Sequence, residues 1–205
     1  MENRNPPLLP GYSPVPPGKI ANVETRLEML ARPAAKAPPP AAASLSLHRW
    51  EAPTLADYRA LFRAVGQNWM WVSRLVMADD RLAAILAEPR VEIYRLMDDN
   101  RAIGLLELDF RHDGECELAF FGLVSDAIGK GAGRLMMSHA IELAWSRPIR
   151  RFWVHTCTHD SQAALPFYCR SGFVPFATLV EVIDDPRLKG VMPRQAAPHV
   201  PLIEP

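Results

Sequence analysis

Hydrophobic and polar positions change period several times along the chain, and each change predicts a strand or a helix. Short apolar or alternating runs are typical of strands, and we expect them at 44–50, 91–97, 103–110, 115–124, 150–158 and 176–183. Apolar residues three and four apart are typical of helices, expected at 54–65, at 73–88 as one or two helices, at 131–144, and from 161 to a stop at Gly172. This order of elements favours an α/β (α+β) fold in which helices flank a mixed central β-sheet.

The first 43 residues have a composition of their own. They hold half of the 20 prolines of the chain, and proline-rich segments form neither helices nor central strands, so most of this arm is expected to be extended linker. Between the proline runs, apolar and charged residues alternate over 22–29. That alternation favours a half-buried strand that docks on the domain, with a short exposed helix as the alternative.

The chain is therefore expected to divide into three parts. A Pro-rich N-terminal arm (1–43) precedes one domain (44–184), because 205 residues are enough for one domain with a core and few for two. An extended tail (185–205) follows. Its spaced prolines indicate an ordered wrap or a partner contact rather than an independent fold.

Charge and cysteine content exclude several classes of protein. The 23 basic and 23 acidic residues balance, so no broad cationic face favours a nucleic acid or an anionic membrane as partner. No apolar run approaches the roughly 18 residues of a membrane span. Three cysteines without CxxC spacing fit reduced thiols better than a disulfide framework. We expect a cytoplasmic protein that binds neither nucleic acid nor membrane.

Three glycines at alternate positions, 129, 131 and 133, precede the amphipathic helix at 131–144. The stretch is neither a Walker loop nor the GxGxxG dinucleotide fingerprint, because its spacing differs from both. Glycines nevertheless let backbone amides crowd an anion, and a helix N-terminus adds partial positive charge. Lys130 and Arg134 add side-chain charge. The stretch predicts a phosphate-binding turn; the alternative is that the glycines only permit close packing of the helix on the sheet.

The strand "ELAFFGLV", the loop "GKGAGR" and the later "ALPFYCRSGF" together resemble the GNAT superfamily of acetyl-coenzyme-A-dependent N-acyltransferases, over Leu45 to Ile183. The resemblance implies a GNAT-like fold, acetyl-CoA as cosubstrate, and direct transfer of the acetyl group to an amine of a small molecule or protein. It also implies that the turn holds the coenzyme pyrophosphate and the preceding strand its pantetheine arm. The implied cofactor-binding residues are Leu123, Val124, Gly129, Lys130, Gly131, Ala132, Gly133, Arg134 and Ser161.

Two positions depart from the family pattern. Ile128 stands where the family usually has Gln or Arg, and Ser161 where an asparagine often contacts the pantetheine arm. The departures keep a second class of function open, a coenzyme-A-binding sensor without turnover. A longer acyl donor and a homodimer also stay open.

Amide formation from a thioester needs a base and an acid. A lysine-like amine is almost wholly protonated at neutral pH, so a base or a dry pocket helps it to attack. Tyr168 matches the tyrosine of the family's "FY" helix and is the expected general acid. Glu117, which some family members match with a water-linked glutamate, is the expected base. On strand periodicity Glu117 shares a face with Ala119, Phe121 and Leu123, whose apolar character would raise its pKa; Glu107 and Asp109 are the competing bases.

The segment "HTCTHD" permits two further hypotheses. His155, Cys157 and His159 alternate, so they could face one way as zinc ligands, or Cys157 could pair with a histidine as a covalent nucleophile. Direct transfer, as the resemblance implies, needs neither. We therefore expect no metal, and ordinary packing of these residues in the sheet.

Acceptor recognition is assigned to Trp69, Trp71 and Arg74 in "GQNWMWVSRL", since the corresponding segment walls the substrate cleft in the GNAT superfamily. The functional interpretation is a pocket for an acceptor with apolar bulk and a carboxylate. The alternative is that these aromatic residues are core and anchor the neighbouring helices.

Overall fold

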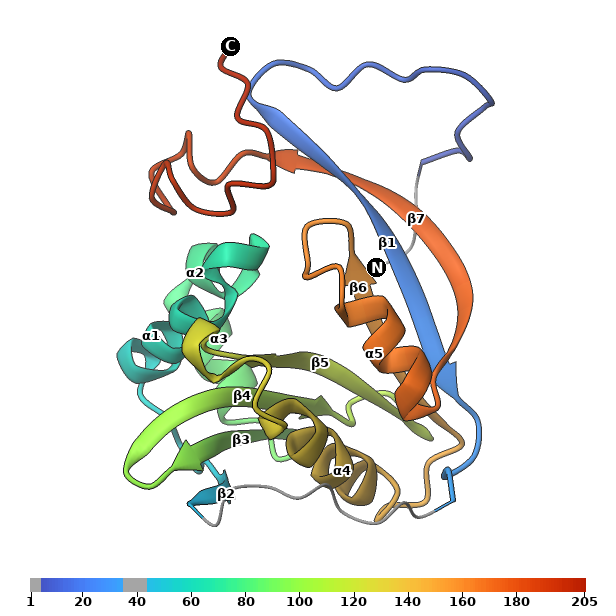
Figure 1. Cartoon of the computed structure of the whole chain (residues 1–205), viewed down its shortest axis with the longest axis vertical. Helices are drawn as coiled ribbons and strands as arrows, with labels where there is room; N and C mark the ends of the chain where they lie inside the picture. The colour runs from blue at the N-terminus through green and yellow to red at the C-terminus, as the bar shows by residue number, and fades with distance from the viewer. Residues whose placement is uncertain (1–4, 35–43) are drawn as a thin grey trace.

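The computed structural model describes residues 5–34 and 44–205 and arranges them around one seven-stranded sheet (Figure 1). The strands are β1 (Lys19–Met29), β2 (Leu45–Arg49), β3 (Val91–Asp98), β4 (Arg101–Asp109), β5 (Glu115–Leu123), β6 (Arg151–Cys157) and β7 (Val174–Asp184). The α-helices are α1 (Leu55–Gly66), α2 (Ser73–Val76), α3 (Asp79–Leu86), α4 (Ala132–Ala144) and α5 (Ala164–Ser171). Two 3₁₀ turns, η1 (Gln67–Trp69) and η2 (Ser125–Ala127), connect them.

The strands lie in the order β2-β3-β4-β5-β6-β1-β7. All neighbours are antiparallel except β5 and β6, which run parallel, so the sheet is mixed as predicted. The strand expected at 22–29 is β1, which begins three residues earlier and lies between β6 and β7. An N-terminal segment is thus an internal strand of the sheet.

Helices cover both faces of the sheet, with α1, α2 and α3 on one face and α4 on the other (Figure 1). Thr54 begins α1 as its N-cap, with its hydroxyl oxygen accepting from the backbone N–H of Asp57 at 3.1 Å. Helix α4 buries an apolar stripe that includes Met137 and Ala140. Across residues 5–34 and 44–205, no helix combines the length and apolar character needed to cross a bilayer.

A β-bulge changes which face of β5 each side chain occupies. Leu108 lies opposite Leu118 and Glu107 opposite Phe120, so Ala119 is the extra residue. Glu117 therefore points to the same face as Phe120, the face covered by α1. The expectation that Glu117 shares a face with Ala119, Phe121 and Leu123 is wrong, because the extra residue reverses the alternation.

The C-terminal tail packs back onto the domain around a buried ion pair. Arg187 donates to Asp185 at 2.7 Å and also to the carbonyl oxygens of Val200 and Pro201, at 2.8 and 3.1 Å. A small apolar cluster holds the tail against the start of β1 and the residue after η1; its members are Ile20, Met70, Met192, Ala196, Ala197 and Val200.

Candidate functional site

A cleft of about 830 Å³ opens where β5 and β6 separate. The two strands pair only as far as Glu117 and Trp153; beyond that point β5 stays with β4, and β6 with β1. Eight of the predicted site residues line this cleft, namely Trp69, Trp71, Arg74, Glu117, Leu123, Gly133, Ser161 and Tyr168. The structure thus brings the predicted acid, base and acceptor segment to one place, beside the glycine turn.

The glycine turn has the backbone geometry of an anion site. Gly129 and Gly131 have φ of +86° and +87°, in the left-handed region that favours glycine. Gly131 caps the N-terminus of α4. In the described chain, the N–H groups of 129–133 donate to no other residue, so they point outward with the positive end of the helix dipole. Lys130 and Arg134 are exposed beside them and form no ion pair with any described residue.

Leu123 and Val124 differ in what their backbones can bind. The N–H of Val124 donates to Ile103 in β4 at 2.9 Å, and its carbonyl accepts from Ala127 at 3.0 Å. Val124 therefore has no backbone N–H left for a pantetheine arm, which corrects that expectation. Successive residues of a strand direct their backbone groups to opposite sides. Leu123 therefore faces the gap that β6 leaves, as a pantetheine-binding edge requires.

Tyr168 reaches the cleft from α5, on the face opposite to Glu117. Its ring packs edge-on against Phe121 and Phe173, with centroids 6.2 and 5.9 Å away. Burial raises the pKa of Tyr168 well above its ordinary value, so the hydroxyl keeps its proton at neutral pH. No described residue accepts a hydrogen bond from it. Tyr168 is therefore a fixed, protonated donor at the cleft wall.

Glu117 stands at the fork between β5 and β6, with a side chain 22% exposed. Burial raises its pKa, while the neighbouring His155, whose Nδ1 lies 3.8 Å from its Oε1, acts in the opposite direction. A carboxylate with a raised pKa and no guanidinium or ammonium partner is suited to accept a proton. The sequence did not predict that His155 lies beside Glu117. Their proximity depends on the register of β6 against β5, which a local pattern does not reveal.

The competing bases are both held in ion pairs. Glu107 is fully buried, accepting from Arg74 Nη2 and from the Tyr58 hydroxyl, each at 2.6 Å. Asp109 accepts from Arg111 Nε through both oxygens, at 3.0 and 2.9 Å. Because both carboxylates already accept hydrogen bonds from a guanidinium group, the geometry favours Glu117 as the base.

The acceptor segment is more structural than the functional interpretation assumed. Arg74 forms an ion pair with Glu107, and its Cζ lies 5.0 Å from the ring centroid of Phe120. Trp71 packs between Phe62 and Phe120, and its Nε1 lies 3.4 Å from Asp160 across the cleft. These two side chains shape the wall, and Arg74 is not available for an acceptor carboxylate.

Trp69 faces the C-terminal tail. Its ring lies 5.9 Å from that of His199, and His199 Nε2 donates to the carbonyl of His159 at 2.8 Å. The tail therefore bridges the two walls of the cleft and closes one end of it. The spaced prolines of the tail did not indicate which residues it would contact.

The two departures from the family pattern have local explanations. Ile128 is 49% exposed at the cleft edge, before the glycine turn. The Ser161 hydroxyl accepts from the N–H of Ala163 at 3.3 Å, in the turn that leads into α5. Ser161 lines the cleft, but its oxygen already serves this turn.

His155, Cys157 and His159 do not form a joint centre. In the described part of the chain no group of three or more His, Cys, Asp or Glu side chains gathers as metal ligands would. Burial raises the pKa of Cys157 to about 11, which leaves little thiolate for nucleophilic attack at neutral pH. His155 and Cys157 lie in β6, and His159 lies in the turn that follows it.

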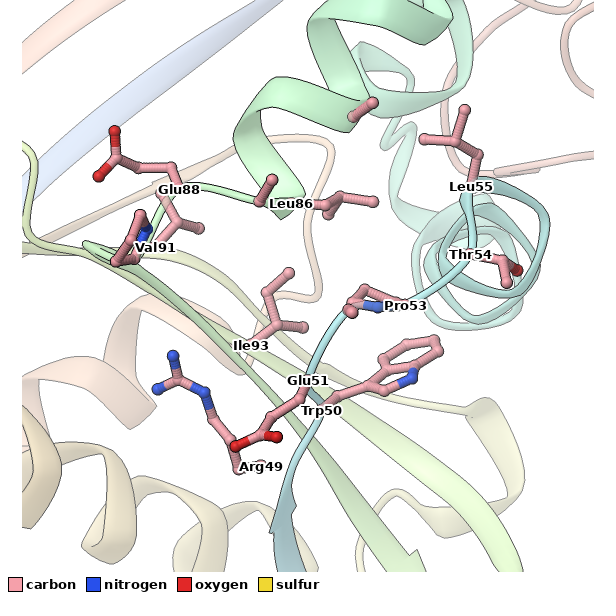
Figure 2. Close-up of a pocket in the computed structure, with 14 residues that line it drawn as sticks. Arg49, Trp50, Glu51, Pro53, Thr54, Leu55, Leu86, Glu88, Val91 and Ile93 are labelled. Carbon is pink, nitrogen blue, oxygen red and sulfur yellow. The ribbon is translucent and has the colours of Figure 1, made fainter.

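A second hollow, of about 610 Å³, lies away from the cleft, between α3 and the loop from β2 to α1 (Figure 2). Pro53 and Ile93 project into it, with Trp50 at one side. Two of its charged residues are paired, Arg49 with Glu92 at 2.9 Å and Glu88 with Arg90 at 3.0 Å, while Glu51, which also lines it, is exposed to solvent.

Comparisons with known proteins identify a family and a shared fold. The profile of the acetyltransferase (GNAT) family matches residues 53–173. A GCN5-related N-acetyltransferase from Kribbella flavida is 18% identical, with a TM-score of 0.54 over 84% of this chain and 63% of its own. An IAA acetyltransferase from Bacillus cereus is 21% identical, with a TM-score of 0.51 over 65% and 79%.

An aminoglycoside acetyltransferase from an uncultured soil metagenomic sample is 13% identical, with a TM-score of 0.53 over 64% of this chain and 89% of its own. No curated protein matches the chain. At these identities the structures show a shared fold, and this chain spans less than two thirds of the Kribbella protein. The family profile, in contrast, covers more than half of the sequence. The chain belongs to the acetyltransferase (GNAT) family.

Proposed function

We propose that the protein is an N-acetyltransferase that moves an acetyl group from acetyl-CoA to an amine by direct attack in a ternary complex. The observation that carries the proposal is the fork of β5 and β6, where Glu117 enters from one face and Tyr168 from the other. Two reactants held from opposite faces would meet in the gap, with the glycine turn beside it. The three cysteines are free thiols, in keeping with the expected cytoplasmic location.

In this mechanism each residue has one task. The N–H groups of 129–133 hold the pyrophosphate of acetyl-CoA, and the free edge at Leu123 orients the pantetheine arm. Glu117 accepts a proton from the acceptor ammonium, directly or through water, so that the amine can form the C–N bond. As the C–S bond breaks, its electron pair stays on sulfur, and Tyr168 donates a proton to it; the second proton that the nitrogen loses on becoming an amide returns Tyr168 to its neutral form through solvent.

The proposal is tested in two steps on the full chain. Acetyl-CoA should raise the melting temperature, and a panel of amines should then release free CoA thiol in an acceptor-dependent way. Stabilisation without release by any amine would favour the coenzyme-A-binding sensor. Absence of both effects would overturn the proposal, and release that is faster with longer acyl-CoA would correct the donor.

A further inference from the structure

Asn22, on β1, has a buried side-chain oxygen without a hydrogen-bond partner in the described structure. The residue is 4% exposed and lines the cleft. Its Nδ2 donates to Oε2 of Glu181 on β7 at 2.9 Å. Because a carboxylate only accepts, this bond fixes the amide orientation, so Oδ1 is the atom left unpaired. A buried acceptor without a donor costs free energy, which indicates a site for a donor.

Glu181 adds a negative charge to the same place. It pairs with no cation in the described chain, and its one hydrogen bond is to Asn22. Desolvation lowers the pKa of the neighbouring His159, so this ring carries little compensating charge. Two acceptors, one of them charged, are suited to an ammonium group.

The charges elsewhere in this half of the cleft point the same way. Arg26 donates to Glu24 at 2.6 Å, and Arg74 and Arg111 are held by Glu107 and Asp109. The cleft arginines named here are therefore neutralised. Glu117, Asp160 and Glu181 remain as cleft carboxylates without a guanidinium or ammonium partner among the described residues.

Glu117 and the Asn22–Glu181 pair lie at opposite ends of one wall. Glu117 is level with Trp153, which is opposite Glu28 on β1. Asn22 is six residues from Glu28, or roughly 20 Å along an extended strand. Because β1 curves only gently (Figure 1), the direct distance is only somewhat shorter, and it calls for an elongated ligand.

We propose that Asn22 Oδ1 and Glu181 form a subsite for a second ammonium group of the acceptor, so that the preferred acceptors are elongated diamines or polyamines. The inference rests on the proposed function and names its substrate class. The reacting amine lies at Glu117, and the remote ammonium donates to Asn22 and Glu181. An acceptor with a remote carboxylate is disfavoured there.

A series of linear α,ω-diamines, compared with n-alkylamines of equal length, tests the subsite. The ratio of kcat/KM for diamine over monoamine should stay near one for short chains and rise at least tenfold once the chain spans the cleft. Spermine should behave as a long diamine. A ratio near one at every length would overturn the inference while leaving amine acetylation intact.

Glu181→Gln should lower the long-diamine ratio about tenfold, the loss expected from one charge-assisted hydrogen bond. Asp184→Asn is the matched control, because Asp184 lies on the same strand but pairs with Lys19 at 2.7 Å outside the cleft. It should keep the wild-type ratio. Equal effects of the two variants would reduce the subsite to general electrostatics and contradict the assignment.

Calorimetric binding of the longest diamine separates this inference from the proposed function. Saturable binding to the wild-type protein, weakened about tenfold by Glu181→Gln, supports the subsite whether or not turnover is observed. If the diamine does not bind, water alone satisfies Asn22 and the inference falls.

Discussion

The position of Glu117 at the end of the β5–β6 pairing determines its protonation chemistry. Its strand stops pairing with β6 at this residue, so the carboxylate is partly buried without the guanidinium partner that Glu107 and Asp109 have. Burial raises its pKa. Because folding favours the protonated form, the ionised carboxylate lowers stability at pH values above the folded-state pKa.

Glu117→Gln should therefore raise the free energy of unfolding at neutral pH while it lowers kcat by about 10²- to 10⁴-fold, the usual contribution of a general base. In the wild type, the rate should rise with pH through a pKa above the ordinary glutamate value, and this acidic limb should vanish in the variant. Stopped assays across pH and urea melts measure the two effects. An unchanged pH profile would show that the base lies elsewhere.

Tyr168 offers a cleaner separation of function from packing. Its hydroxyl has no acceptor among the described residues, and its ring packs against aromatic neighbours. Tyr168→Phe keeps the ring, so stability should stay within about 0.5 kcal/mol. If the hydroxyl protonates the thiolate, kcat at saturating substrates should fall about 10²-fold. Unchanged turnover in a well-folded variant would remove Tyr168 from the mechanism.

At the scale of elements, the cleft is made by strands that fail to pair. β5 and β6 run parallel for three residues and then part, and the bulge at Ala119 turns Glu117 toward α1. The glycine turn follows directly and begins α4. A helix N-terminus, a free strand edge and a base therefore lie within one short stretch of sequence, residues 117–133.

Gly129→Ala tests the turn. At φ +86° a residue with a Cβ is strained, although the Cβ would meet no atom within 4 Å. The backbone strain should cost about 1–2 kcal/mol and distort the turn. Acetyl-CoA should therefore bind more weakly, by about tenfold or more. Gly190→Ala is the control: its φ is +70°, it also meets nothing within 4 Å, and it lies in the tail. Isothermal titration measures both. Equal affinities in the two variants would argue against phosphate binding at this turn.

At the scale of the whole molecule, the two ends of the chain complete the site. β1 supplies Asn22, and the tail closes the cleft through its contacts with Trp69 and His159. Arg187 holds the tail in place by binding Asp185 and the carbonyls of Val200 and Pro201. Acceptor binding should therefore depend on residues far from the glycine turn.

Arg187→Met leaves buried Asp185 and several carbonyls unpaired, and should cost about 3–5 kcal/mol of stability. If the variant folds, the acceptor KM should rise more than the Kd for acetyl-CoA, because the tail borders the acceptor end. Arg194→Met, which removes an exposed ion pair with Glu204, should change stability by about 0–1 kcal/mol. A tail that affects both ligands equally would contradict this division of the cleft.

Sequence patterns predicted the elements well, because periodicity reports local burial. The alternation at 22–29 predicted a strand, but not its place between β6 and β7, which depends on pairing with residues more than 120 positions away. The bulge at Ala119 leaves no trace in composition, so the face of Glu117 was predicted wrongly. The sequence favoured Arg74 as a ligand for an acceptor carboxylate. Its actual partner, Glu107, lies on another element, so the sequence alone could not identify this ion pair.

A crystal structure of the protein with acetyl-CoA tests the central claim most directly. The account predicts the pyrophosphate against the N–H groups of 129–133, and the thioester in the gap between β5 and β6, between Glu117 and Tyr168. A coenzyme bound elsewhere, with this turn empty, would contradict it.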